Sequence, residues 1–168
     1  MELEEVQGGT MDTTGKKTII LFSGDFDKCM AAFIIANGAA AMGDEVTIFF
    51  TFWGLNLLRK KKPPKTRGKT FLQKMFGGMM PKGPGGLSKM NFMGMGAPLM
   101  RKVMRSQNAM SLDDLIASAR ELDVKLVVCT LSMDILGFKE EELIDGLEFA
   151  GVAAYLGEAD EANVNLFI

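Results

Sequence analysis

Short, nearly continuous apolar runs recur along the chain, and they constrain its fold more than any other feature. The runs are Lys16–Phe22 (KKTIILF), Glu45–Phe52 (EVTIFFTF) and Lys125–Cys129 (KLVVC). Their length and their content of Val, Ile, Leu and Phe predict buried strands. The second run is continuous enough to be covered on both faces. A sheet that lies between layers of helices is therefore expected.

Helical patterns alternate with these runs and complete the prediction. Strands that alternate with helices predict an open, mainly parallel α/β sheet of about five strands, with helices on both faces. The sequence Ser-x-x-Asp at Ser111 resembles a capping box at the start of a helix. The predicted helices are Phe26–Gly43 with a cap at Ser23 or Asp25, Ser111–Glu121, a short one at Lys139–Ile144 and Val152–Ala162, and a last strand follows at Val164–Ile168.

The 168 residues suffice for one domain with a real core. Residues 1–15 mix acids, Gly and Thr without periodicity, so we expect a disordered tail. Residues 16–168 are expected to form the single α/β domain, with a basic, Met- and Gly-rich insertion at about 63–110. Nine of the 14 methionines lie between Met75 and Met110. We predict no regular element in Lys65–Met110.

The net charge of −2 hides a strong division along the chain. Thirteen of the 19 Lys and Arg residues lie in Arg59–Arg105, and no acidic residue lies between Glu45 and Asp113. This segment is expected to meet an anionic surface, either a peripheral membrane contact or an acidic protein. An excursion that folds back on its own core, or packs in an oligomer, accounts for it equally well. Nucleic acid is not expected as a partner, because aromatic residues are few here and the chain as a whole is acidic.

The chain contains no histidine, which excludes Ser-His-Asp and Cys-His nucleophiles and His-based metal sites. Its two cysteines lie a hundred positions apart and form no CxxC pair, so neither structural zinc nor a disulfide framework is expected. We expect no metal and no cofactor. The apolar runs are too short to span a membrane, and the chain shows no secretory leader. A reducing, cytoplasmic setting is the simplest expectation.

The stretch Lys125–Phe138, KLVVCTLSMDILGF, places Cys129 where a buried strand gives way to polar residues. In an open α/β sheet, ligands bind at the carboxyl ends of the strands. Thr130, Ser132 and Asp134 are residue types that cap helices, and a helix N-terminus stabilises a thiolate. Cys129 is therefore a candidate reactive thiol. The alternative is a cysteine that is buried as a small hydrophobic residue.

Two further candidates lie near the first strand. Cys29 falls in the first turn of the first predicted helix, where the helix dipole lowers a thiol pKa, but its apolar neighbours favour a packed core residue. The loop Ser23, Gly24 and Asp25 is a candidate ligand loop for a nucleotide or coenzyme A. Its signal is weak, because it contains one glycine, lacks GxGxxG and carries an acid that repels anions.

Several blocks of the sequence are distinctive, and together they extend over nearly all of Lys16–Ile168. With them the chain resembles the DsrE/DsrF-like proteins, and it is similar to the branch labelled peroxiredoxin-like or sulfurtransferase. No Thr-x-x-Cys stands around Cys129, so the peroxiredoxin label fits poorly. The blocks are Ser23–Lys28, Ile34–Gly43, Phe49–Lys60, Cys129–Phe138, Glu141–Ala159 and Asn163–Ile168.

The resemblance implies a DsrE-like, flavodoxin-like three-layer sandwich that is cytoplasmic and homo-oligomeric. It implies a sulfur relay in which Cys129 carries sulfane sulfur as a persulfide, supported by Thr130, Ser132 and Asp134, and passes it to an acceptor thiol. The implied partners are sulfur-carrier or rhodanese-type proteins. It assigns no role to Cys29. A non-catalytic scaffold that docks on a membrane complex or an acidic sulfur carrier through Arg59–Arg105 is the alternative.

Overall fold

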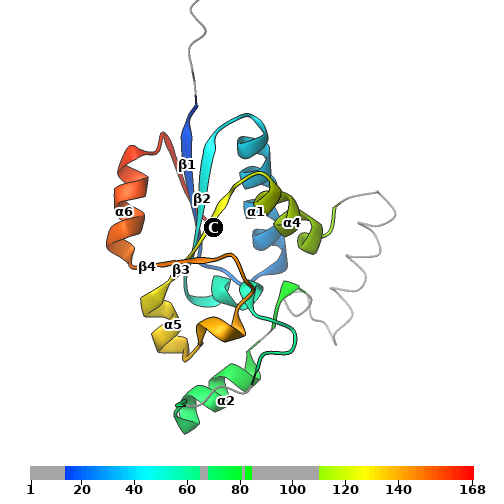
Figure 1. The fold of residues 1–168 in the computed structure, drawn as a ribbon, viewed down its shortest axis with the longest axis vertical. Coiled ribbons are helices and arrows are strands. Elements are labelled where there is room, and N and C mark those ends of the chain that lie inside the picture. Colours follow the sequence, from blue (N-terminus) through cyan, green and yellow to red (C-terminus); the bar gives the residue numbers. More distant parts are fainter. Residues whose placement is uncertain (1–13, 65–67, 81, 85–109) are drawn as a thin grey trace, which may run out of the picture.

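A computed structural model describes residues 14–64, 68–80, 82–84 and 110–168. At its centre lies a five-stranded sheet in the order β4-β3-β2-β1-β5, in which every neighbouring pair is parallel (Figure 1). The predicted open parallel α/β sheet of about five strands is confirmed. The strands are β1 (Lys16–Leu21), β2 (Glu45–Phe50), β3 (Lys125–Cys129), β4 (Glu148–Ala150) and β5 (Val164–Phe167).

Helices cover both faces of the sheet, as predicted. Two helices, α1 and α4, pack together on one face, and α6 lies on the opposite face (Figure 1). The described helices are α1 (Phe26–Ala41), α2 (Phe71–Met79), α4 (Leu112–Glu121), α5 (Thr130–Leu136) and α6 (Val152–Glu161), with 3₁₀ turns η1 (Phe52–Leu58) and η3 (Glu140–Glu142). In the part of the chain that the structure describes, no helix is both long and apolar enough to cross a membrane.

Helix α4 shows why its residues form this element. Ser111 is the N-cap, and its Oγ accepts a hydrogen bond from the backbone N–H of Asp114 at 3.2 Å. The Asp114 carboxylate accepts one in return from the Ser111 N–H at 3.0 Å, which completes the predicted capping box. The hydrogen bonds from Ser111 hold the pKa of Asp114 below its usual value. The predicted apolar stripe is also buried, at Leu112, Leu115, Ile116 and Ala119.

Alternation along β3 sends its side chains to two different cores. Leu126 and Val128 belong to the large core beneath α1 and α4. Val127 and Cys129 belong to a smaller core beneath α6. Because successive side chains of a strand point to opposite faces, the pairing of β3 with β2 decides which core receives the thiol.

Two elements near the carboxyl end of the chain differ from the prediction. The three-residue edge strand β4 was not predicted, because Glu148-Phe149-Ala150 is too short to form an apolar run. The predicted helix over Lys139–Ile144 is wrong beyond the single turn η3. The Ile144 N–H donates to the Leu58 carbonyl at 2.8 Å, and the Lys60 N–H donates to the Glu142 carbonyl at 2.8 Å. These bonds draw the chain out of the helix and against the end of η1 and the residues that follow it.

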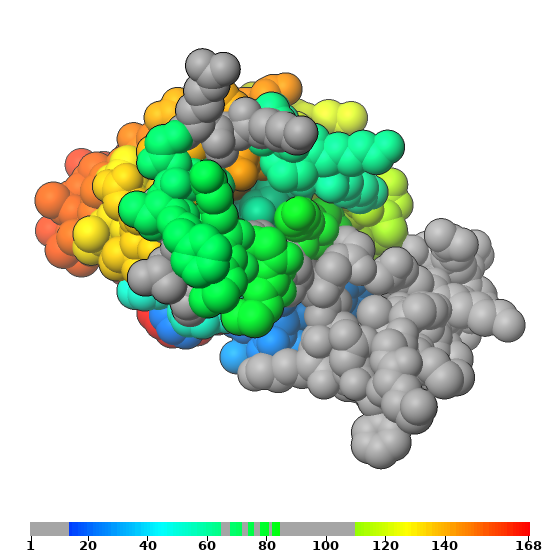
Figure 2. Space-filling view, turned by 90° about the horizontal axis from the view of Figure 1, so that it is seen from below, coloured from blue at the N-terminus to red at the C-terminus, as the bar shows by residue number. Residues whose placement is uncertain are grey.

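The prediction of no regular element in Lys65–Met110 is wrong at α2. Six non-glycine residues, Phe71–Phe76, precede the glycines that dominated the prediction, and several of them are good helix formers. Seen from below, α2 (green) lies on the outside of the molecule beside α5 (yellow) (Figure 2). Residues 85–109 of the predicted insertion, and residues 1–13 of the predicted tail, lie outside the described residues.

Buried charges anchor the described part of the insertion to the domain. Lys69 and Glu142 form an ion pair in which both side chains are buried. The Arg59 guanidinium lies 4.4 Å from the centre of the Phe138 ring, and burial lowers its pKa. Its Nη1 donates to the carbonyl of Met80 at 3.5 Å, beyond the end of α2. The residues before and after α2 are thereby tied to η3 and to the packing around Phe138.

Candidate functional site

Cys129 is the last residue of β3 and the N-cap of α5, so the strand ends and the helix begins at the thiol. Its Cα pairs with that of Ala150, the last residue of β4. Helix α5 ends at Gly137, which adopts the left-handed conformation with φ +68°. The first N–H groups of a helix have no acceptor within it, and those of α5 begin directly after Cys129. This is the position that the sequence predicted for the candidate thiol.

An apolar core surrounds the Cys129 side chain, which is 5% exposed. The core consists of Phe49 and Val127 from the sheet and Tyr155 from α6. The rings of Phe49 and Tyr155 lie 4.8 Å apart between centroids. The Tyr155 hydroxyl shares a hydrogen bond with Thr18 Oγ1, with an O···O distance of 3.2 Å. The thiol therefore lies at the carboxyl edge of the sheet but beneath α6.

The prediction that Thr130, Ser132 and Asp134 cap the helix is wrong, because all three lie inside α5 and Cys129 is its N-cap. Ser132 is 1% exposed, and its Oγ shares a hydrogen bond with Thr51 Oγ1 at an O···O distance of 2.8 Å. Thr130 is exposed, and its hydroxyl donates to the Ala150 carbonyl at a long 3.5 Å. Asp134 is exposed at the outer side of the helix. Of the three, Ser132 joins the first turn of α5 to the end of β2.

Cys29 lies in the first turn of α1 and is completely buried. Burial, with smaller effects from the negative charges of Asp25 and Asp27, raises the pKa of its thiol to about 12. Its Sγ lies 3.7 Å from the Ser23 carbonyl oxygen, to which the S–H donates. Cys29 belongs to the core beneath α1, whereas Cys129 belongs to the core beneath α6. The two thiols thus face opposite sides of the sheet.

Two backbone N–H groups of the loop Ser23-Gly24-Asp25 donate hydrogen bonds within the protein. The N–H of Ser23 donates to the Ile168 carbonyl at 3.3 Å, and the N–H of Asp25 donates to Ser23 Oγ at 3.1 Å. A Cβ added to Gly24 would lie 2.8 Å from the Trp53 carbonyl oxygen. The loop is closed by hydrogen bonds and packed beneath η1, which is unlike a loop that cradles a phosphate.

Sequence reasoning missed a group of aromatic rings at the carboxyl edge of the sheet. Phe22 lies 5.5 Å from Phe52, 6.4 Å from Trp53 and 5.8 Å from Phe167, measured between ring centroids. Phe22, Trp53 and Phe167 are exposed. Phe52 has φ +44°, a conformation that is strained for a bulky residue. The rings come from the residue after β1, from η1 and from β5, so only the local signal Phe52-Trp53 was visible in the sequence.

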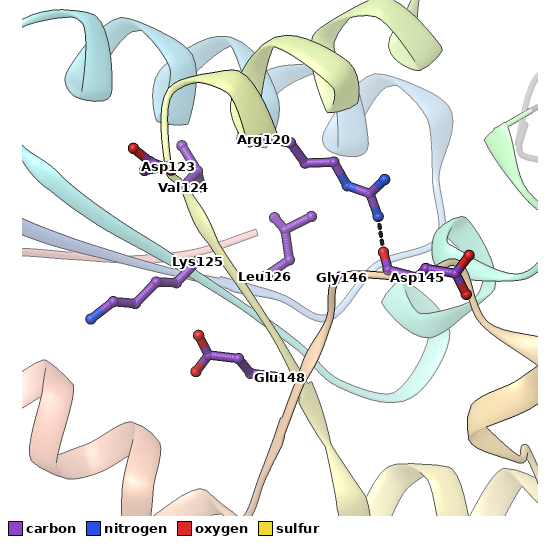
Figure 3. Close-up of a pocket in the computed structure, with 8 residues that line it drawn as sticks. All are labelled: Arg120, Asp123, Val124, Lys125, Leu126, Asp145, Gly146 and Glu148. Carbon is purple, nitrogen blue, oxygen red and sulfur yellow. Dashed lines mark hydrogen bonds between the residues drawn. The ribbon is translucent and has the colours of Figure 1, made fainter.

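A cavity of about 440 Å³ lies at the opposite end of β3 (Figure 3). It is lined by Lys125 and Glu148, the first residues of β3 and β4, and by Asp145, whose carbonyl accepts a hydrogen bond from Arg120. Cys129 is four residues further along the strand, roughly 13 Å away. The cavity is therefore separate from the candidate thiol site. Among the described residues, no group of three or more His, Cys, Asp or Glu side chains lies close enough together to hold a metal ion.

The fold and the position of Cys129 define a class of protein. Its members are built on an open parallel α/β sheet and carry a thiol at the carboxyl end of one strand. A profile of the DsrE/DsrF/DrsH-like family matches residues 13–167 of the sequence. The chain belongs to this family, and the resemblance seen in the sequence is confirmed.

Two relatives align with almost the whole chain. The uncharacterized protein YrkE of Bacillus subtilis is 57% identical over 159 residues, which cover 94% of this chain and 99% of YrkE. The sulfur carrier protein DsrE2 of Allochromatium vinosum is 36% identical over 161 residues, which cover 91% of this chain and 98% of DsrE2. The family to which this chain belongs thus includes a sulfur carrier.

Solved structures share the fold at low identity. The ychN protein of Escherichia coli superposes with a TM-score of 0.54 at 11% identity, over 92% of this chain and 99% of that chain. The protein MTH1491 of Methanobacterium thermoautotrophicum superposes with a TM-score of 0.56 at 9% identity, over the same shares. At these identities the likeness supports the DsrE-like fold alone.

Proposed function

We propose that this protein is a sulfur relay that holds sulfane sulfur as a persulfide on Cys129 and passes it to an acceptor thiol. The observation that carries the proposal is the position of Cys129, which ends β3 at the carboxyl edge of the sheet and begins α5. Membership of a family that includes a sulfur carrier supports it. In contrast, the Cys29 thiol, with a pKa of about 12, stays protonated at neutral pH and is a poor nucleophile.

The relay consists of two thiol exchanges. The Cys129 thiolate attacks the outer sulfur of a donor persulfide, a new S–S bond forms, and the donor leaves as a thiolate. An acceptor thiolate then attacks the outer sulfur on Cys129, and the Cys129 thiolate leaves. Because thiolates act as both nucleophile and leaving group, neither step needs a general base. The absence of histidine from the sequence is compatible with this chemistry.

The proposal extends to partners and setting. The donor and acceptor are sulfur-carrier or rhodanese-type proteins that present a thiol or persulfide. The protein works as a homo-oligomer in the cytoplasm, where thiols stay reduced. Exposed Phe22, Trp53 and Phe167 at the edge that holds Cys129 support a protein contact there, since exposed apolar patches mark interaction surfaces.

Intact mass after treatment with glutathione persulfide tests the relay. We expect the wild-type chain and the Cys29→Ala variant to gain one sulfur atom that dithiothreitol removes. Cys129→Ala should gain none. Cys29→Ala is the matched control, because it removes the other cysteine and leaves the core beneath α6 intact. A sulfur gain that persists in Cys129→Ala, or that is lost in Cys29→Ala, contradicts the assignment.

A second candidate function, docking through the insertion, is favoured by α2. Phe71, Met75 and Met79 are exposed at intervals of four residues and form one apolar stripe, and Lys74 is exposed beside them. Helix α2 contains one basic residue, Lys74, and no acidic one. An apolar helix face beside a positive charge favours contact with an anionic membrane or an acidic protein. Flotation with anionic vesicles tests the membrane form of this role. Binding that is lost in Met75→Ser, while sulfur loading stays intact, would support docking as a separate function.

A further inference from the structure

The relay needs access to Cys129, but the thiol is 95% covered. On the face of the sheet opposite α1 and α4, helix α6 covers the thiol and contributes Tyr155 and Ala159 to the core around it. Protein interiors are close-packed, so a second sulfur atom and an approaching thiolate do not fit without displacement of this cover.

Helices α4 and α6 both contain ten residues but differ in how they begin. Helix α4 has a capping box at Ser111 and two acidic residues in its first turn. Helix α6 begins at Gly151, no described side chain caps its first N–H groups, and its first turn holds no acidic residue. Gly157 lies in its interior, where glycine lowers helix stability. The start of α6 therefore lacks the local stabilisation that α4 has.

Polar contacts hold α6 to the sheet at its carboxyl half. Lys16 Nζ lies 2.9 Å from a Glu158 carboxylate oxygen and 2.7 Å from one of Glu161. The Asn165 amide donates to the Ala159 carbonyl at 3.0 Å. In contrast, every residue of the segment 151–157 except Tyr155 is exposed. Few buried contacts and an uncapped helix end are the marks of a segment that opens locally.

Tyr155 is the side chain by which the first two turns of α6 pack against Cys129. It is the one buried residue of α6, and it is held through its hydroxyl contact with Thr18 and its ring contact with Phe49. We propose that residues 151–157 are a movable segment of α6 and that Tyr155, which this segment carries, is the cover over Cys129. The inference rests on the proposed relay, since it describes how donor and acceptor thiols reach the same cysteine.

The rate at which iodoacetamide modifies each cysteine of the folded protein tests the cover. Peptide mass spectrometry separates modification of Cys129 from modification of Cys29. We expect Cys129 to react through local opening and Cys29 to react far more slowly. Gly157→Ala stabilises the helix and should lower the rate of Cys129 modification about fivefold. Tyr155→Phe removes the hydroxyl contact with Thr18 and should raise the rate of Cys129 modification about fivefold.

Gly38→Ala in α1 is the matched control. A Cβ added to Gly38 or to Gly157 meets no described atom within 4 Å, so both substitutions stabilise a helix without a clash. Gly38→Ala should leave the Cys129 rate unchanged. Equal rates for both cysteines in the wild-type chain, which indicate global unfolding, would overturn the proposal. The proposal would also be overturned if Gly157→Ala and Gly38→Ala changed the rate of Cys129 modification equally.

The outcome separates the cover from the relay. If the labelling rates follow the expectation but glutathione persulfide adds no sulfur to Cys129, the cover stands and the sulfur function fails. If sulfur loading succeeds while Gly157→Ala and Tyr155→Phe leave the labelling rate unchanged, the relay stands and the cover fails.

Discussion

The hydrogen bond between Thr51 and Ser132 is the contact that joins the first turn of α5, and thus the start of the candidate site, to the end of β2. Its two ends differ in burial, because Ser132 is almost completely buried and Thr51 is half-buried. An unsatisfied polar group costs free energy in proportion to its burial, so the two possible truncations should have unequal effects. Loss of the Thr51 hydroxyl should therefore destabilise the protein more than loss of the Ser132 hydroxyl.

Ser132→Ala removes the buried hydroxyl and leaves that of Thr51, which regains a hydrogen bond from water. The free energy of unfolding should fall by about 1 kcal/mol, the net value of one hydrogen bond. Thr51→Val leaves the Ser132 hydroxyl buried without its partner and should cost about 2 kcal/mol. The double variant leaves neither group stranded, so it should be about 1 kcal/mol more stable than Thr51→Val alone.

Equilibrium urea unfolding of the four proteins measures these free energies by linear extrapolation. Thr130→Ala is the control, because its hydroxyl is exposed and its hydrogen bond is long, so the cost should stay below about 0.5 kcal/mol. Equal costs for the two single variants, with an additive double variant, would refute the reasoning. That result would mean that the hydroxyls find other partners or that α5 is held by packing alone.

Two further predictions concern other parts of the fold. A Cβ at Gly54 would lie 2.1 Å from the Leu21 carbonyl oxygen, so Gly54→Ala should lower the free energy of unfolding by about 2 to 3 kcal/mol, and an unchanged urea midpoint would contradict this packing. The pKa of Asp114 is lowered in the folded state by its bonds to Ser111, so its carboxylate stabilises the fold above the unfolded pKa of 3.8, and this contribution is lost as pH falls through the lower folded value. Asp114→Asn should therefore destabilise the protein at pH 7, and its deficit relative to the wild type should shrink towards pH 2.5; a deficit that is constant with pH would count against the capping box.

Much of the sheet and the helix α4 could be predicted because their signals are local. Apolar runs at β1, β2 and β3 show burial directly in the sequence. The capping box at Ser111 involves residues three positions apart. The edge strand β4 and the helix α2 escaped prediction because their stability comes from neighbours distant in the chain, namely β3 for β4 and α5 for α2.

The sequence by itself determined that the chain forms an open parallel α/β sheet and that Cys129 ends one of its strands. It also restricted the chemistry, because a chain without histidine must activate a thiol through backbone groups or nearby cations. Each of these conclusions depends on residue type and on spacing within about ten positions.

Only the tertiary structure decided what surrounds each thiol. Parallel pairing with β2, more than seventy residues earlier in the chain, turns Cys129 towards α6 and not towards the core that holds Cys29. Burial, which no local pattern determines, raises the pKa of Cys29 to about 12 and outweighs its place in the first turn of a helix. The cover over Cys129 likewise comes from Tyr155, 26 residues later in the sequence. The difference between the two cysteines is therefore a property of the folded packing.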